Sequence, residues 1–392
     1  MATQLRCYAC GELADLPAAR CGCGEPLWFD TDPTGFTYPD GKPWSMWRYD
    51  DLLPVAEPDG VMAAAGGTPL VRTPGFDGYA GCRVHLKDEA ENPTGSFKDR
   101  GSAVGCTWAI EAGYDAVGTV SHGNMAMSMA ANAAGVNLDC VVLVPADIPP
   151  ARLTFIAQYD PTIVRVEGDY GRLYYEALDI GAEAGVPFIN SDVPLRVAGQ
   201  KTVALEICEA MAPSVPDAIV LPVSSGGHAS GVWKALRELQ MAGRIDTIPR
   251  LYCVQAAAVD PIATAYRNEA DRVAAVADAD TIAYSIANPD PPSGNRILAG
   301  VRATDGAAIS VSDAAMAEAM DVLAADAGFS SEAASAAALA GLRQLTDAGE
   351  IGSTEDVVAI TTGTGFKEGA DVDVETEMAT VSGLREQLPA LF

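Results

Sequence analysis

Short apolar runs rich in β-branched residues alternate with alanine-rich amphipathic segments along the chain after Gly66. The runs that we predict to be strands are 83–87, 116–120, 140–144, 162–166, 218–223, 251–254 and 357–361. The segments that we predict to be helices are 101–112, 124–134, 172–184, 202–211, 229–241, 314–327 and 332–345. Because strands that alternate with helices usually form parallel βαβ units, the pattern predicts an α/β fold with an open parallel sheet.

The charge balance of the chain restricts its partners. The chain has 392 residues with Lys+Arg 25 and Asp+Glu 53, and its formal net charge is −28. Nucleic acids and anionic membrane surfaces attract basic patches, so this balance argues strongly against both as the main partner. Hydrophobic residues make up 49% of the chain, which is enough for a folded core and excludes an intrinsically disordered acidic protein.

The same composition indicates the salt concentration in which the protein works. An acid-rich surface that avoids lysine stays hydrated at high salt, which favours a halophilic protein over an ordinary acidic mesophilic enzyme. No apolar run is long enough to span a bilayer, and the first residues lack the apolar core of a secretory signal. We therefore expect a cytoplasmic protein.

Four of the nine cysteines are clustered near the N-terminus. They form two closely spaced pairs with adjacent glycines: Cys7, Cys10, Cys21 and Cys23. Four thiolates in two such turns are typical of a closed tetrahedral zinc site, whereas redox thiols or disulfides are the alternative that a cytosol disfavours. We predict a zinc-ribbon-like module over 1–30, stabilised by its metal because it is too short to bury a sufficient core, and a linker over 31–66. The remaining five cysteines are predicted to be small buried residues.

A lysine lies in the first of several loops that join a predicted strand to a predicted helix. Ligands of open α/β sheets bind at the carboxyl ends of the strands, so these loops are the expected place for chemistry. Lys98 lies within Asn92 to Gly101, where a turn becomes a helix. The positive end of the helix dipole disfavours its protonated form and leaves a nucleophilic amine. The alternative is a solvated surface lysine.

Three further loops carry small polar residues. The loop from Ser121 to Asn124 offers an amide and the start of a helix, and the loop from Ser224 to His228 offers the hydroxyls and consecutive backbone amides of a phosphate cradle. The segment from Thr361 to Lys367 offers hydroxyls that suit an aromatic nitrogen. Read alone, each of these loops is an ordinary turn.

Together these loops resemble a known family, the pyridoxal-phosphate enzymes of the tryptophan-synthase-β type, and within it the threonine synthases. The string from Asn92 to Gly101 is highly specific, and the order of the later loops agrees with it. The resemblance implies a two-lobed catalytic body over 67–392, with a smaller mobile lobe at about 105–192. It also implies pyridoxal 5'-phosphate as the cofactor.

Carried over residue by residue, the resemblance also implies roles for individual side chains. Lys98 would bind the coenzyme covalently and move protons, Asn124 would bind the coenzyme's ring oxygen, and Thr362 would face the pyridine nitrogen. The coenzyme's phosphate would be held by Ser224, Ser225, Gly226, Gly227 and His228. Ser121 would bind the substrate's α-carboxylate, and Lys87 and Arg196 would bind the phosphate of O-phosphohomoserine. The alternative for Arg196 is a surface ion pair.

The phosphate loop departs from the family pattern at Ser224, Ser225 and His228, and His122 replaces a smaller residue. We expect cofactor binding to survive these changes, while the two histidines either contact substrate or only fill space.

The expected reaction converts O-phospho-L-homoserine and water to L-threonine and phosphate. The alternative is a related lyase or β-replacement enzyme, such as a serine/threonine dehydratase or a cysteate-synthase-like protein. A catalytically silent relative and a zinc-ribbon nucleic-acid adaptor are the non-enzymatic alternatives, and the charge balance makes the second remote. A homodimer is an open alternative to a monomer.

Overall fold

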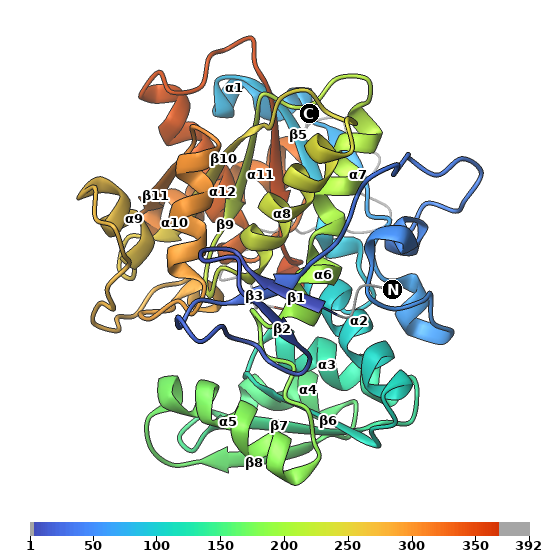
Figure 1. The fold of residues 1–392 in the computed structure, drawn as a ribbon. Coiled ribbons are helices and arrows are strands. Elements are labelled where there is room, and N and C mark those ends of the chain that lie inside the picture. Colours follow the sequence, from blue (N-terminus) through green and yellow to red (C-terminus); the bar gives the residue numbers. More distant parts are fainter. Residues whose placement is uncertain (1–3, 368–392) are drawn as a thin grey trace, which may run out of the picture.

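The computed structural model describes residues 4–367 of the chain, and its main body is built around one six-stranded sheet (Figure 1). The strands lie in the order β11-β10-β9-β12-β5-β4, and all neighbours are parallel except β4 and β5. Their bounds are β4 (Leu70–Arg72), β5 (Arg83–Asp88), β9 (Ala218–Pro222), β10 (Arg250–Ala256), β11 (Ala307–Val311) and β12 (Asp356–Thr361). The predicted α/β fold with parallel strands is confirmed.

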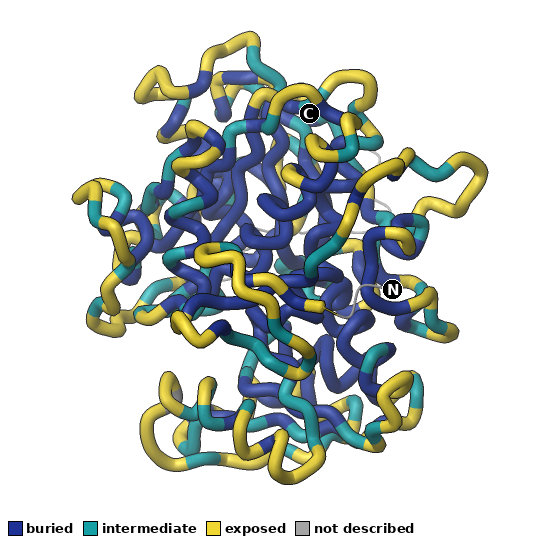
Figure 2. Tube along the Cα trace, in the orientation of Figure 1, coloured by how far each residue is buried: buried dark blue, intermediate teal, exposed yellow. Residues whose placement is uncertain are grey.

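Helices cover both faces of this sheet. Successive side chains of a strand point to opposite faces, so Ile219 and Leu221 of β9 pack in one apolar cluster while Ala218 and Val220 pack in the other. The first cluster contains residues of α7 (Thr202–Met211), α8 (Gly227–Met241), α9 (Pro261–Arg267) and α10 (Gly294–Ala303). The second contains residues of α1 (Asp77–Ala80), α11 (Asp313–Ala327) and α12 (Ala333–Asp347). The core therefore lies on both sides of the sheet, and Figure 2 shows its central strands β9, β10 and β12 almost entirely buried.

A second, smaller parallel sheet lies below the main body in Figure 1. Its strands are β6 (Ala116–Val120), β7 (Asp139–Pro145) and β8 (Thr162–Val166), in that order. The helices near it are α2 (Lys98–Glu111), α3 (Asn124–Ala134), α4 (Thr154–Ala157) and α5 (Tyr170–Ala184), and α6 (Pro194–Gln200) packs against α2. The bounds 105–192 for a mobile lobe stay a prediction.

The N-terminal segment forms a three-stranded antiparallel sheet in front of the junction between the two larger sheets (Figure 1). Its strands are β1 (Gln4–Cys7), β2 (Leu13–Asp15) and β3 (Leu27–Phe29). Trp28 of β3 packs on Trp233 of α8 with ring centroids 5.6 Å apart, and Arg20 pairs with Asp192 at 3.1 Å. The small module is thus docked on the body by both apolar and charged contacts.

Several predicted elements have the predicted bounds, and others were missed. The strands 116–120 and 162–166 and the helices 124–134 and 202–211 match β6, β8, α3 and α7. The edge strand β11 and the helix α10 were not predicted, because Ala307–Val311 is short and alanine-rich and Gly294–Ala303 follows a Pro- and Gly-rich stretch. Within residues 4–367 we find no helix that combines the length and apolar character needed to cross a membrane.

Candidate active site

A cavity of about 200 Å³ opens where strands of both parallel sheets end and helices begin. The loops after β6, β9 and β12 line it, together with the starts of α2, α3, α8 and α12. The lining includes nine residues predicted from the sequence: Lys98, Ser121, Asn124, Ser224, Ser225, Gly226, Gly227, His228 and Thr362. The structure therefore brings four loops that are distant in sequence to one cavity, as expected for the carboxyl edge of parallel strands.

Lys98 is the first residue of α2, and its amine lies in an environment that disfavours a positive charge. Burial lowers the pKa of Lys98 to about 7, the nearby positive charge of Arg196 contributes, and the carboxylate of Glu332 acts in the opposite direction. The Nζ atom lies 4.3 Å from the ring centroid of Phe97. A lysine with such a pKa has a substantial neutral, nucleophilic fraction near pH 7, whereas an ordinary lysine is almost entirely protonated there.

The start of α8 forms an anion cradle. Gly226 precedes the helix with a left-handed backbone, φ 89°, which favours glycine. A Cβ atom on Gly227 would lie 2.2 Å from the backbone oxygen of Ser191, so only glycine fits there. The backbone amides of a 15-residue helix begin at this point, beside the hydroxyls of Ser224 and Ser225. This donor set suits a phosphate group.

His228 packs flat against Phe97. The ring centroids are 4.1 Å apart and the interplanar angle is 16°. Neither ring nitrogen of His228 has a hydrogen-bond partner among residues 4–367. Burial lowers the pKa of His228 to about 3, and the positive charges of Lys98 and Arg100 contribute. The imidazole is therefore neutral near pH 7.

The side chains of Asn124 and Thr362, which are also predicted to contact the cofactor, form hydrogen bonds within the protein. Asn124 donates from Nδ2 to Glu332 Oε2 at 2.7 Å, and its Oδ1 accepts from Lys367 Nζ at 2.6 Å. The hydroxyl of Thr362 lies 2.9 Å from the hydroxyl of Ser335. These hydrogen bonds fix the orientation of both side chains.

The two cations predicted to bind a substrate phosphate do not line the cavity. Lys87 is fully buried, and its ammonium donates to Glu206 Oε2 and to the Thr68 carbonyl, both at 2.6 Å. Lys87 thus lies in a buried charge network outside the cavity lining, and its role toward a substrate phosphate stays a prediction.

Arg196 contacts the backbone of Lys98. Its Nη1 donates to the Lys98 carbonyl at 3.2 Å, and its Nε donates to the Ile189 carbonyl at 2.9 Å. Its Nη2 is buried and has no hydrogen-bond partner in the part of the chain that the structure describes. The expectation of a surface ion pair does not hold for this arginine, and its role toward a phosphate group stays a prediction.

The polar residues of the cavity that sequence reasoning did not identify include Glu332, Tyr174 and Tyr284. Glu332 immediately precedes α12, so an acidic residue before an alanine-rich helix was the available signal. Tyr174 donates its hydroxyl proton to Asp192 at 2.6 Å. No signal in the sequence distinguishes the two tyrosines from other aromatic residues.

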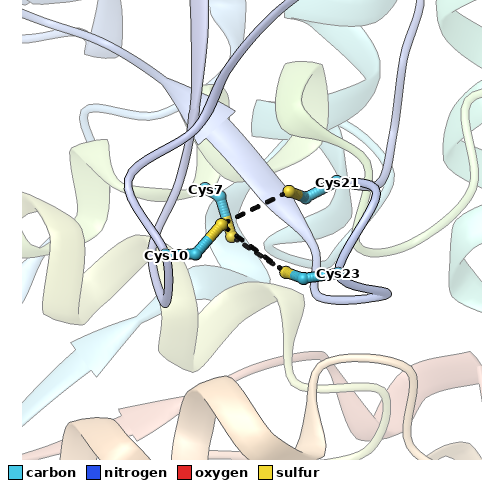
Figure 3. A group of neighbouring side chains, drawn as sticks. All are labelled: Cys7, Cys10, Cys21 and Cys23. Carbon is cyan, nitrogen blue, oxygen red and sulfur yellow. Dashed lines mark hydrogen bonds between the residues drawn. The ribbon is translucent and has the colours of Figure 1, made fainter.

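The four N-terminal cysteines converge at the tip of the small module (Figure 3). Their sulfur atoms all lie within 4.8 Å of one another, with Cys7 and Cys23 at 3.6 Å and Cys10 and Cys21 at 3.5 Å. The cluster can hold a metal ion, and four thiols suit zinc. The other five cysteines are free and buried, which confirms their prediction.

Comparison with known proteins assigns this fold and site to a class. A family model described as "Pyridoxal-phosphate dependent enzyme" matches residues 61–363, and the chain belongs to this family. Threonine synthase of Methanocaldococcus jannaschii is 34% identical over 93% of this chain and 92% of the relative, and threonine synthase of Mycobacterium tuberculosis is 33% identical over 83% and 90%. The chain is a pyridoxal-phosphate-dependent, threonine-synthase-like enzyme of the lyase type.

Solved structures share the same fold at lower identity. Maize serine racemase is 22% identical with a TM-score of 0.65, covering 83% of this chain and 92% of its own. The processed form of threonine deaminase isoform 2 from Solanum lycopersicum is 19% identical with a TM-score of 0.65, covering 88% of this chain and 94% of its own. These likenesses concern the fold alone.

Proposed function

We propose that this enzyme converts O-phospho-L-homoserine and water to L-threonine and phosphate. The observation that carries the proposal is the juxtaposition, in one cavity, of Lys98 and the anion cradle at the start of α8. The relatives that match most of the chain are named threonine synthase, and they support this reaction over others of the family.

The residues of the cavity fit pyridoxal phosphate. The glycine pair Gly226 and Gly227, with Ser224 and Ser225, would hold the phosphate of the coenzyme, while Thr362 would face its pyridine nitrogen. Bound coenzyme supplies an electron sink that is conjugated to the α-carbon of the substrate. A neutral hydroxyl beside the pyridine nitrogen does not force that nitrogen to be cationic, which suits elimination and replacement chemistry.

The chain's own residues would handle the substrate and its protons. Lys98, with its pKa near 7, would take the α-proton and return a proton later, because both its forms are accessible near neutral pH. Ser121 would bind the α-carboxylate. Overall, the γ-carbon exchanges its phosphate group for a proton, the β-carbon exchanges one proton for the hydroxyl of water, and the other proton of water leaves with the phosphate. Arg196 Nη2 would stabilise the departing anion.

The serine/threonine dehydratase alternative has one observation in its favour. Such an enzyme needs no large phosphate site for its substrate, and neither Lys87 nor Arg196 lines the cavity. The two reactions differ in their products, since the dehydratase forms a keto acid and ammonia.

The deciding experiment measures phosphate release from O-phosphohomoserine by the purified enzyme with coenzyme, with serine and threonine as competing substrates. We expect phosphate release and no keto acid, and no activity in Lys98→Ala. Keto acid formation from serine or threonine without phosphate release would overturn the proposal in favour of the dehydratase.

We also propose that the cysteine cluster binds one structural zinc ion. The four sulfur atoms are close enough to share a single ion. A metal would hold the two cysteine-bearing turns of the small module together, because a module this short cannot bury a sufficient core of its own.

A further inference from the structure

Two oppositely charged side chains hold the amide group of Asn124 from its two ends. Lys367 Nζ donates to Asn124 Oδ1 at 2.6 Å, and Asn124 Nδ2 donates to Glu332 Oε2 at 2.7 Å. An ammonium group can only donate, and a carboxylate can only accept. This pair of contacts therefore determines which end of the amide is the oxygen.

The position of Lys367 is not explained by stabilisation of the neighbouring helix. Asn124 is the first residue of α3, and the start of a helix carries a partial positive charge that disfavours a cation. Lys367 also donates to the carbonyl oxygens of Thr94 and Gly95, each at 3.1 Å. It thus connects the segment after β12, the loop that leads to Lys98, and the start of α3.

The orientation of the amide decides what Asn124 can offer to a ligand. Its oxygen is engaged by Lys367, and one of its two N–H groups is engaged by Glu332. Among the residues that the structure describes, the second N–H group has no partner, and Asn124 lines the cavity together with Lys98. An N–H group stabilises an anionic oxygen, whereas a flipped amide would present a carbonyl oxygen and repel it.

We propose that Lys367 and Glu332 are positioning residues that hold Asn124 with its free N–H group toward the ring oxygen of pyridoxal phosphate. The amide thereby favours the ionised form of that oxygen. The inference deepens the proposed function and rests on it, because it takes pyridoxal phosphate to occupy the cavity with its ring oxygen at Asn124, as the family resemblance implies. It does not depend on which amino acid is the substrate.

The test compares Lys367→Met with the wild-type enzyme by coenzyme dissociation constant and by the absorption spectrum of the bound coenzyme. We expect coenzyme binding to weaken by about tenfold or more, as for loss of a charged hydrogen bond, and part of the visible absorbance to move to shorter wavelength. Lys367→Arg, which keeps a donor and the charge, should restore most of both properties. Lys42→Met removes a surface lysine that pairs with Asp50 and should change neither.

A double variant separates positioning from a merely structural role. Asn124→Asp removes the N–H donor and should reproduce the spectral change of Lys367→Met, and combining the two should add little, because both act through one contact. Glu332→Leu should act in the same direction. Additive effects, or a loss of thermal stability with an unchanged spectrum, would show that Lys367 only stabilises the loop that contains Thr94 and Gly95.

The outcomes also distinguish this inference from the proposed reaction. An enzyme that binds coenzyme on Lys98 but releases no phosphate from O-phosphohomoserine disproves the reaction and leaves the positioning role intact. A Lys367→Met enzyme with phosphate release intact and a wild-type coenzyme spectrum and dissociation constant disproves the positioning role alone.

Discussion

Lys87 and Glu206 form a fully buried ion pair, with 2.6 Å between Nζ and Oε2. Arg100 pairs with the same carboxylate and with Glu89, so four charges share one interior site. Burial by itself would raise the pKa of Glu206, but the positive charges of Arg100 and Lys87 outweigh it and lower that pKa to about 2. The network joins β5, α2 and α7.

This network predicts that Lys87→Met lowers the free energy of unfolding by about 3 kcal/mol, because Glu206 loses one of its two cationic partners in the interior. The KM of the folded variant for a phosphorylated substrate should differ from that of the wild-type enzyme by at most about twofold. Denaturant unfolding and steady-state kinetics measure the two effects. Lys42→Met, at an exposed pair, should cost at most about 0.5 kcal/mol. A large rise in KM without a loss of stability would contradict this prediction and would support a role for Lys87 in substrate binding.

The pKa of Lys98 predicts how fast coenzyme attaches to the protein at different pH values. Attachment needs the neutral amine, so the rate should rise with pH through a midpoint near 7. Arg196→Gln removes a neighbouring positive charge and should move that midpoint upward, whereas Arg196→Lys should leave it nearly in place. Stopped-flow absorbance measures the rate. A wild-type midpoint close to that of a free lysine would contradict the burial argument.

The buried imidazole of His228 predicts a contribution to acid sensitivity. Its pKa falls from 6.5 to about 3 on folding, so between these values the unfolded chain binds more protons. The contribution of His228 to the free energy of unfolding is therefore fully present above pH 6.5 and is lost as the pH falls toward 3. We expect His228→Asn to remove this part of the pH dependence, which denaturant unfolding at several pH values measures. His85→Gln, outside the cavity, is the matched control, and equal behaviour of the two variants would refute the prediction.

The cysteine cluster predicts one zinc ion per chain by elemental analysis. Removing the metal with a chelator, or changing Cys10 to Ser, should lower the thermal unfolding temperature, because the small module loses its main constraint. Cys82→Ser, at a buried cysteine far along the chain, should retain the zinc. A metal-free protein with unchanged unfolding would show that the thiols have another role.

Most residues of the candidate site could be predicted from the sequence, because the features that mark them are local. Lys98 at the start of a helix, and glycines 226 and 227 before another, can be read from residue types and spacing alone. Glu332 and Lys367 could not be identified in this way, since their importance comes from contact with Asn124, more than 200 positions away in the chain.

The alternation of apolar runs with amphipathic segments by itself determined that this is an α/β protein with its candidate site in the loops after the strands. Such patterns can be read from the sequence because strand periodicity and helix-start residues involve only a few neighbouring positions. Only the tertiary structure decided which charges face the cavity and which are buried. Lys87 precedes the lysine loop in the sequence, yet it points into the interior because β5 is covered on both sides and Glu206 of α7 offers a partner there. Pairing between distant charges depends on how helices pack over a sheet, and no local pattern encodes that packing.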